Sequence, residues 1–87
     1  MIFTVVFYGN LAPKVTTKTV SKGISSSYNV NFTVNSGFSN GIVYLKSARS
    51  GTNVLTIRNF SFNGYTLNCE AFGQGSDTMY FEFVQVL

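Results

Sequence analysis

The sequence contains no histidine and only one cysteine, Cys69. Histidine is the side chain that most often transfers protons at neutral pH, so its absence argues against acid–base catalysis. A single cysteine cannot form an intrachain disulfide, and a zinc site built from cysteine and histidine ligands is excluded. We therefore expect a protein that is not an enzyme, with no catalytic residue, no metal site and no cofactor.

Charge is also scarce, because only 10% of the residues are charged, against about 25% in ordinary soluble domains. Serine, threonine, asparagine and glycine fill most of the polar positions instead. Lysine and glutamate keep free domains apart in solution, so a surface with few of them is expected to be covered in part by other subunits.

The length of 87 residues is too small to be divided between two hydrophobic cores, so we expect one domain over residues 1–87. Hydrophobic residues make up 45% of the chain and aromatic residues 16%, which is too much for a disordered segment. Residues 2–8 lack a basic region before them and are too short to cross a bilayer, so we expect synthesis in a host cytoplasm and no membrane partner.

Alternating apolar and polar residues, β-branched residues and short apolar runs predict strands along the whole chain. The expected strands cover residues 2–8, 14–21, 28–35, 42–46, 54–62, 65–72 and 78–87. Residues 23–27 and 73–77 are expected to be loops because they are rich in glycine and serine. No segment favours a substantial helix. These features predict an all-β fold, a small antiparallel β-sandwich or barrel of about seven strands, ordered as a meander or a short Greek key.

The dipeptide Asn63-Gly64 is typical of a two-residue hairpin turn, and it predicts a register for the flanking strands. The expected opposed pairs are Phe62 with Tyr65, Phe60 with Leu67, and Arg58 with Cys69. The inward positions change parity within residues 54–62, from Leu55 and Ile57 to Phe60 and Phe62. We therefore expect a β-bulge near Arg58-Asn59. In residues 28–35, Tyr28, Val30, Phe32 and Val34 are expected to face the core.

The charged residues are ordered, because all six cations precede the three acidic residues in the chain. A basic half and an acidic half could orient neighbouring copies, or a basic groove could bind single-stranded nucleic acid between exposed aromatic rings. The groove would use Lys14, Lys18, Lys22, Lys46, Arg49 and Arg58, with Tyr28 and Tyr44 as stacking platforms. A simpler interpretation is that the lysines of residues 14–22 protect an edge strand from pairing with other chains.

Catalytic alternatives have little support. Glycoside hydrolysis needs two carboxyl groups about 5 to 9.5 Å apart, and Glu70 and Glu82 are the one pair to consider. Glu82 is expected to pair with a cation instead. Cys69 faces Arg58 in the predicted register, which could lower the pKa of its thiol, but a small buried core residue is favoured.

Residues 2–8 and 78–87 are apolar at both odd and even positions, so both of their faces are expected to be covered. The expected assembly interface includes Ile2, Val6, Tyr8, Tyr80, Val84 and Val86. The composition, with neutral polar residues expected outside, aromatic residues inside and frequent glycines, is of the kind seen in structural proteins of viruses and bacteriophages. We therefore expect a non-enzymatic structural subunit of a virion, a capsid decoration or tail component that binds its own copies or a larger capsid or tail protein. The alternatives are a phage-type single-stranded DNA-binding protein and a carbohydrate-binding β-sandwich.

Overall fold

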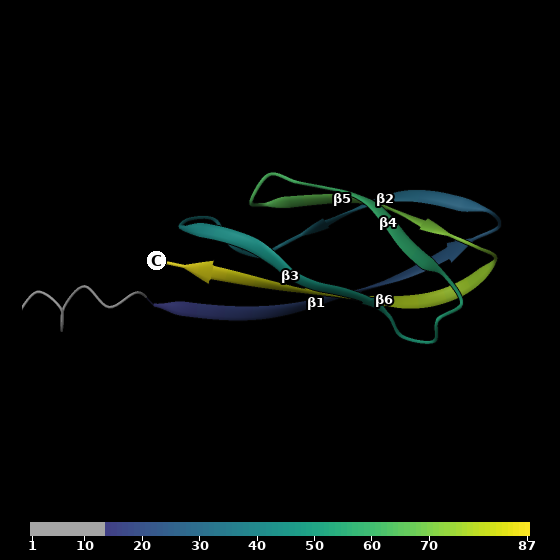
Figure 1. Cartoon of the computed structure of the whole chain (residues 1–87), viewed down its shortest axis with the longest axis horizontal. Helices are drawn as coiled ribbons and strands as arrows, with labels where there is room; N and C mark the ends of the chain where they lie inside the picture. The colour runs from purple at the N-terminus through teal and green to yellow at the C-terminus, as the bar shows by residue number, and fades with distance from the viewer. Residues whose placement is uncertain (1–13) are drawn as a thin grey trace, which may run out of the picture.

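The computed structural model describes residues 14–87, which form a sandwich of two antiparallel three-stranded sheets (Figure 1). The strands are β1 (Val15–Ser26), β2 (Asn29–Asn35), β3 (Ile42–Ser50), β4 (Thr56–Phe62), β5 (Thr66–Phe72) and β6 (Gly75–Val86). The predicted all-β class is confirmed, and these residues contain no helix. The strand expected at residues 2–8 lies outside the described residues.

Neighbouring strands in each sheet are mostly distant in the sequence. β6 lies between β1 and β3 in the first sheet, and β5 lies between β2 and β4 in the second. Within the described residues, the β4–β5 hairpin is the one connection that stays in a single sheet, and the other connections cross between the sheets. A meander is therefore the wrong strand order, because alternation along a strand does not reveal which strand lies beside it.

β1 and β6 have 12 residues each and pair along their full length, from Val15 opposite Val86 to Ser26 opposite Gly75. The loops expected at residues 23–27 and 73–77 are therefore largely strand. Each segment is weak in strand-forming residues, but the two provide each other with hydrogen-bonding partners. Long-range pairing has overridden local propensity here.

The core is formed by the facing sides of the central strands. On β6, Met79, Phe81 and Phe83 have no exposed surface. The ring of Phe81 lies 5.9 Å from that of Phe32 on β2, and the ring of Phe83 lies 5.4 Å from that of Phe62 on β4, measured between centroids. β6 thus packs against both edge strands of the opposite sheet.

The alternation expected in residues 28–35 is confirmed from Val30 onward. Val30, Phe32 and Val34 belong to the core, while the asparagine and threonine residues between them are exposed. Tyr28 is exposed rather than buried, because it precedes the first residue of β2.

The predicted hairpin exists, but its register is wrong. Phe62 lies opposite Leu67 instead of Tyr65, and the centre of the turn is Gly64-Tyr65. Gly64 has a φ of 97°, which fits the first central position of a type II′ turn. The side chain of Asn63 explains the shift, because its Oδ1 atom accepts hydrogen bonds from the amides of Tyr65 and Thr66. Asn63 therefore precedes the two central residues of the turn, and its side chain stabilises the turn.

The bulge expected near Arg58-Asn59 is confirmed. Arg58 pairs with Glu70 and Ser61 with Asn68, so two residues of β4, Asn59 and Phe60, lie opposite one residue of β5. Asn59 has a φ of 58°, in the left-handed region. The expected burial of Phe60 is wrong, since it remains 46% exposed. The bulge accommodates one extra residue in β4, so the side chain of Phe62 points into the core.

A second bulge, which was not predicted, lies at Lys46 on β3. Leu45 pairs with Phe83, and Ser47 pairs with Glu82, so Lys46 has no opposite residue. The bulge lets β3 continue to Ser50, four residues past the predicted end, while its inward positions change from odd to even numbers.

Candidate interaction surfaces

Lys18 and Lys22 extend from β1 toward the opposite sheet. Their Nζ atoms each donate a hydrogen bond of 2.8 Å, Lys18 to the carbonyl of Gly37 and Lys22 to that of Thr33. Lys18 also lies 4.6 Å from the ring centroid of Phe38. Because β1 and β2 are both edge strands, these lysines bridge the open side of the sandwich. Inward-directed charge of this kind hinders pairing with another chain.

The acidic residues do not form a separate pole. Glu82 lies on the outer face of the first sheet, 3.7 Å from the Nζ of Lys46. Glu70 lies on the outer face of the second sheet, with its Oε1 2.6 Å from the Nε of Arg58. The expected pairing of Glu82 with a cation is confirmed. The expected separation of basic and acidic halves is wrong, and Glu70 and Glu82 lie on opposite sides of the sandwich, so they are no catalytic pair.

Glu70 is held by three side chains. Its carboxylate accepts hydrogen bonds from Asn29 Nδ2 at 2.6 Å, from Arg58 Nε at 2.6 Å and from Asn59 Nδ2 at 2.9 Å. The bonds from Asn29 and Arg58 are the main reason why the pKa of Glu70 is below its usual value. The guanidinium of Arg58 lies 4.2 Å from the ring centroid of Phe72, so it is oriented by a second contact. The carboxylate of Glu70 on β5 thus holds Arg58 and Asn59, at the bulge of β4, in place.

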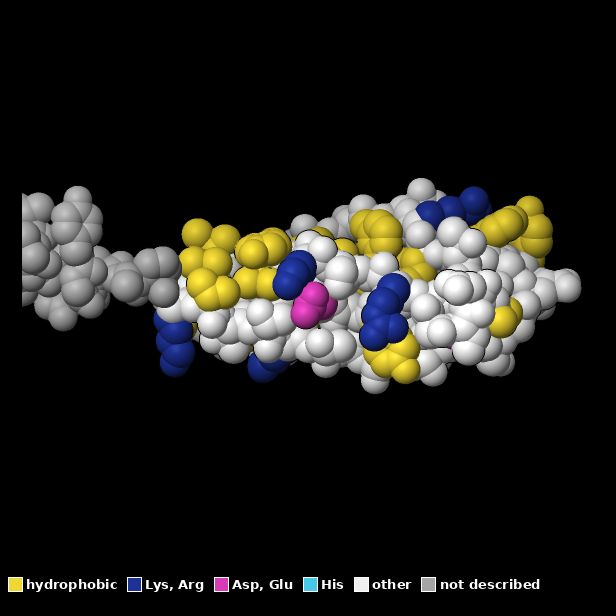
Figure 2. Space-filling view, turned by 60° about the horizontal axis from the view of Figure 1, so that its bottom comes forward, with side chains coloured by type: hydrophobic (Ala, Val, Ile, Leu, Met, Phe, Trp, Pro, Cys, Tyr) yellow, Lys and Arg dark blue, Asp and Glu magenta, His cyan; other side chains and the backbone are white. Residues whose placement is uncertain are grey.

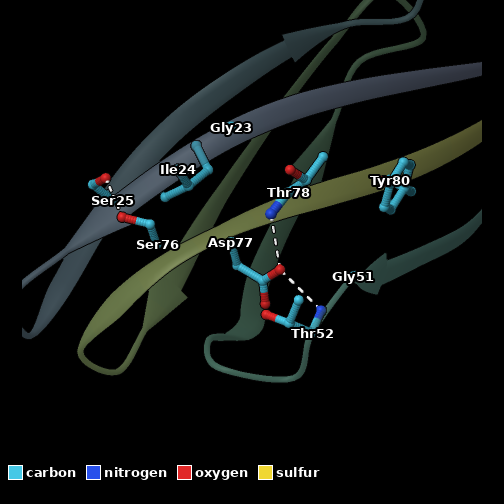
Figure 3. A pocket seen from close by; sticks show the side chains of 9 residues that line it. All are labelled: Gly23, Ile24, Ser25, Gly51, Thr52, Ser76, Asp77, Thr78 and Tyr80. Atoms are coloured by element: carbon cyan, nitrogen blue, oxygen red, sulfur yellow. Dashed lines mark hydrogen bonds between the residues drawn. The ribbon is translucent and has the colours of Figure 1, made fainter.

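Asp77 fixes the β3–β4 connection (Figure 3). Its carboxylate accepts hydrogen bonds from the Ser50 hydroxyl and from the amides of Thr52, Val54 and Thr78. These bonds, with that of Ser50 foremost, hold the pKa of Asp77 well below its usual range. A hollow of about 430 Å³ lies beside it. Because these hydrogen bonds occupy the carboxylate of Asp77, its role is to hold the β3–β4 connection in place.

An apolar patch covers one end of the outer face of the first sheet. Cross-strand pairs place its residues together: Val15, Ile42, Tyr44, Val84 and Val86. Val15, Ile42 and Tyr44 are 60%, 71% and 48% exposed. Figure 2 shows hydrophobic side chains gathered at this end, and a cation beside a carboxylate farther along the same face. We call these five residues the apolar patch.

The expected assembly residues fall into two groups. Val86 is partly exposed in the apolar patch, whereas Val84 lies beneath its exposed residues and is only 3% exposed, so Val84 offers little surface to a partner. Tyr80 lies on the same face but is covered by Arg49, whose guanidinium carbon is 4.3 Å from the ring centroid. Ile2, Val6 and Tyr8 lie outside the described residues.

The residues of the expected nucleic-acid groove are dispersed. Lys18 and Lys22 bridge the sheets, and Lys14 immediately precedes β1. The others are divided between the two outer faces of the sandwich: Lys46, Arg49 and Tyr44 on the first sheet, and Arg58 on the second. Tyr28, the other expected platform, packs edge-on against Phe72 with centroids 4.9 Å apart. The two tyrosines therefore do not form one stacking platform.

Cys69 is a buried core residue, as favoured from the sequence. It lies opposite Phe32 on β2 and opposite the bulge on β4, so the expected pairing with Arg58 is wrong. Burial raises the pKa of its thiol to about 11, and the charge of Lys22 offsets only part of this effect. The thiol is therefore protonated and unreactive at neutral pH.

A pocket of about 350 Å³ opens in the second sheet beside the β4 bulge. Its lining consists of Asn31, Phe32, Thr33, Asn59, Asn68 and Cys69. Sequence analysis did not assign this site. The signals for it were the outward asparagines of residues 28–35 and the change of parity at the bulge, but the sequence did not show that β2 and β4 flank the same strand.

Comparisons with known proteins do not identify a relative: no family model matches the chain, and no curated protein or solved structure matches it. Within residues 14–87 there is no helix long and apolar enough to span a membrane.

Proposed function

We propose that this protein is a non-enzymatic structural subunit that associates with copies of itself through the apolar patch. The particle that it helps to build is proposed to be a virion, with the chain as a capsid decoration or tail component. The proposal of a virion rests on the composition of the chain, which is rich in neutral polar residues and poor in charged ones. Support for the association is the patch.

The patch has the features of an interface. Single exposed apolar side chains are normal, but contiguous ones on a sheet indicate contact with another molecule. Val15, Val86 and Ile42 are cross-strand neighbours, and Tyr44 adjoins them beside Val84. Farther along the same face lie Thr19 and Glu82 in the next row, and after them Tyr80, which is covered by Arg49. The apolar surface is thus confined to one end.

A second copy is the proposed occupant because of where the amino-terminal sequence joins the sandwich. Lys14 exchanges backbone hydrogen bonds with Leu87, which places the start of the described chain at the patch. Residues 2–8, which are apolar at odd and even positions alike, lie only a few residues upstream in the sequence. In the sequence, an apolar segment thus precedes the strand that contributes Val15 to the apolar patch. A specific interface buries at least about 1,000 Å² in total, so we expect residues 2–8 to contribute to it.

Sedimentation velocity tests this proposal. The unmodified chain should form oligomers at a concentration where a variant carrying Ile42→Lys and Tyr44→Lys is monomeric. Both side chains are exposed in the single chain, so the substitutions should leave the fold intact. Tyr65→Lys, at an equally exposed tyrosine on the β4–β5 turn, is the matched control and should assemble normally. An unmodified chain that stays monomeric up to roughly millimolar concentration would refute self-association.

Single-stranded DNA binding is the competing hypothesis, and the dispersal of the cations weighs against it. It is tested by titrating a labelled oligonucleotide at low and high salt. Phosphate contacts make affinity fall steeply with salt, and changing Lys14, Lys18 and Lys22 to Gln should then flatten the slope by up to about two units. Strong binding of this kind by the monomer would favour the DNA-binding function over assembly.

A further inference from the structure

We propose that the pocket beside the β4 bulge binds a neutral carbohydrate. The site lies on the second sheet, whereas the apolar patch lies on the first. This inference is therefore independent of the assembly function, and either can fail without the other.

The lining of the pocket is rich in neutral hydrogen-bonding groups. Asn31 and Thr33 come from β2, Asn68 from β5 and Asn59 from the bulge. Each side-chain amide offers both donors and an acceptor, and the threonine hydroxyl offers both in one atom. Adjacent sugar hydroxyls also donate and accept at once, so they match this set. The pocket volume of about 350 Å³ falls within the range of small-molecule sites.

Several of these groups are free to bind a ligand. Within residues 14–87, the side chains of Asn31, Thr33 and Asn68 make no hydrogen bond to the protein. Asn59 is different, because its Nδ2 donates to Glu70 at 2.9 Å. That bond orients the amide and leaves its oxygen as an acceptor. The pocket thus combines one fixed amide with three side chains that lack internal partners.

The carboxylate next to the pocket is already paired with a cation, which argues against a cationic ligand. Glu70 is paired with Arg58 on the same outer face. Lys22 donates to the carbonyl of Thr33 at the open side of the sandwich. A metal ion would therefore find no free carboxylate among the pocket-lining residues, and the side chains that line the pocket are all uncharged.

The backbone is strained where the pocket opens. Asn59 has a φ of 58°, which is uncommon for a residue other than glycine, and such outliers cluster at functional sites. The bulge interrupts β4–β5 pairing opposite Cys69. It also leaves the ring of Phe60, the next residue, exposed, although Phe60 does not line the pocket. Within the pocket itself, the ring of Phe32 is the aromatic part of the lining.

The test is calorimetric titration of the full chain with neutral hexoses, N-acetylhexosamines and their oligosaccharides. Thr33→Ala and a variant with Asn31→Ala and Asn68→Ala should each weaken binding by about tenfold or more. Thr56→Ala is the matched control for Thr33→Ala, because Thr56 is exposed at the edge of the same sheet but does not line the pocket. It should bind like the unmodified chain. Affinity should be insensitive to salt.

Three results would overturn the proposal. The first is no binding of any of these sugars up to about 10 mM, which corresponds to a negligible affinity. The second is binding that persists unchanged in the lining variants. The third is binding only of charged oligosaccharides with a strong dependence on salt. Because the substituted side chains are exposed and make no internal hydrogen bonds, circular dichroism should confirm that the variants remain folded.

Discussion

Gly75, the first residue of β6, provides a sensitive test of how the two sheets are joined. It has a φ of 130°, and a Cβ atom placed there would lie 2.5 Å from the Cγ1 of Val54 in the β3–β4 connection. Gly75→Ala should therefore destabilise the fold in two ways. Positive φ at a residue other than glycine costs about 1 to 3 kcal/mol, and the steric overlap adds about 1 to 3 kcal/mol.

Two further variants separate these effects. Gly64→Ala changes a glycine with a φ of 97° and nothing within 4 Å of the new Cβ atom. It should cost only the backbone strain, about 1 to 3 kcal/mol. Val54→Ala removes the overlapping methyl group from an exposed side chain and should have little effect alone. In the Val54→Ala background, Gly75→Ala should then be less destabilising by about 1 to 3 kcal/mol.

Urea unfolding followed by circular dichroism measures these differences, since the chain has no tryptophan. All variants should be compared at one protein concentration, because assembly would make stability depend on concentration. Equal costs for Gly75→Ala with and without Val54→Ala would refute the packing of the β3–β4 connection against β6. An unchanged stability of Gly64→Ala would refute the positive φ in the hairpin turn.

Three other predictions follow from the core and the charged groups. Phe83→Ala should lower the free energy of unfolding by about 3 to 5 kcal/mol, because the ring is fully buried, and unfolding in urea measures this. Cys69 should react with a thiol reagent only as fast as the chain unfolds, and rapid labelling of the folded protein would contradict its burial. Glu70 has a lowered pKa, so its contribution to stability should be complete above the usual value of about 4.5 and should disappear as pH falls through the lowered value. Glu70→Gln should therefore reduce the pH dependence of urea unfolding in that acidic range, and an identical profile would disprove the role of its hydrogen bonds.

The sequence alone determined the class of fold and the faces of several strands. Alternation identified the inward side of β2, and the change of parity in residues 54–62 identified the bulge of β4. These features are local, because the side chains of a strand point alternately to two faces and only one face meets the core. The role of Cys69 as a core residue and the pairing of Glu82 with a cation also followed from residue type and neighbours.

Tertiary structure decided which strands are adjacent and where the charged side chains go. The apolar patch exists because Val15, Ile42 and Val86 lie in one row across strands far apart in the chain. The pocket exists because β2 and the β4 bulge flank the same strand, β5. Even the hairpin register depended on Asn63 binding backbone amides beyond the turn. Alternation predicts to which face of a sheet a side chain points, but it does not predict which strand lies alongside. That partner depends on the packing of the whole core.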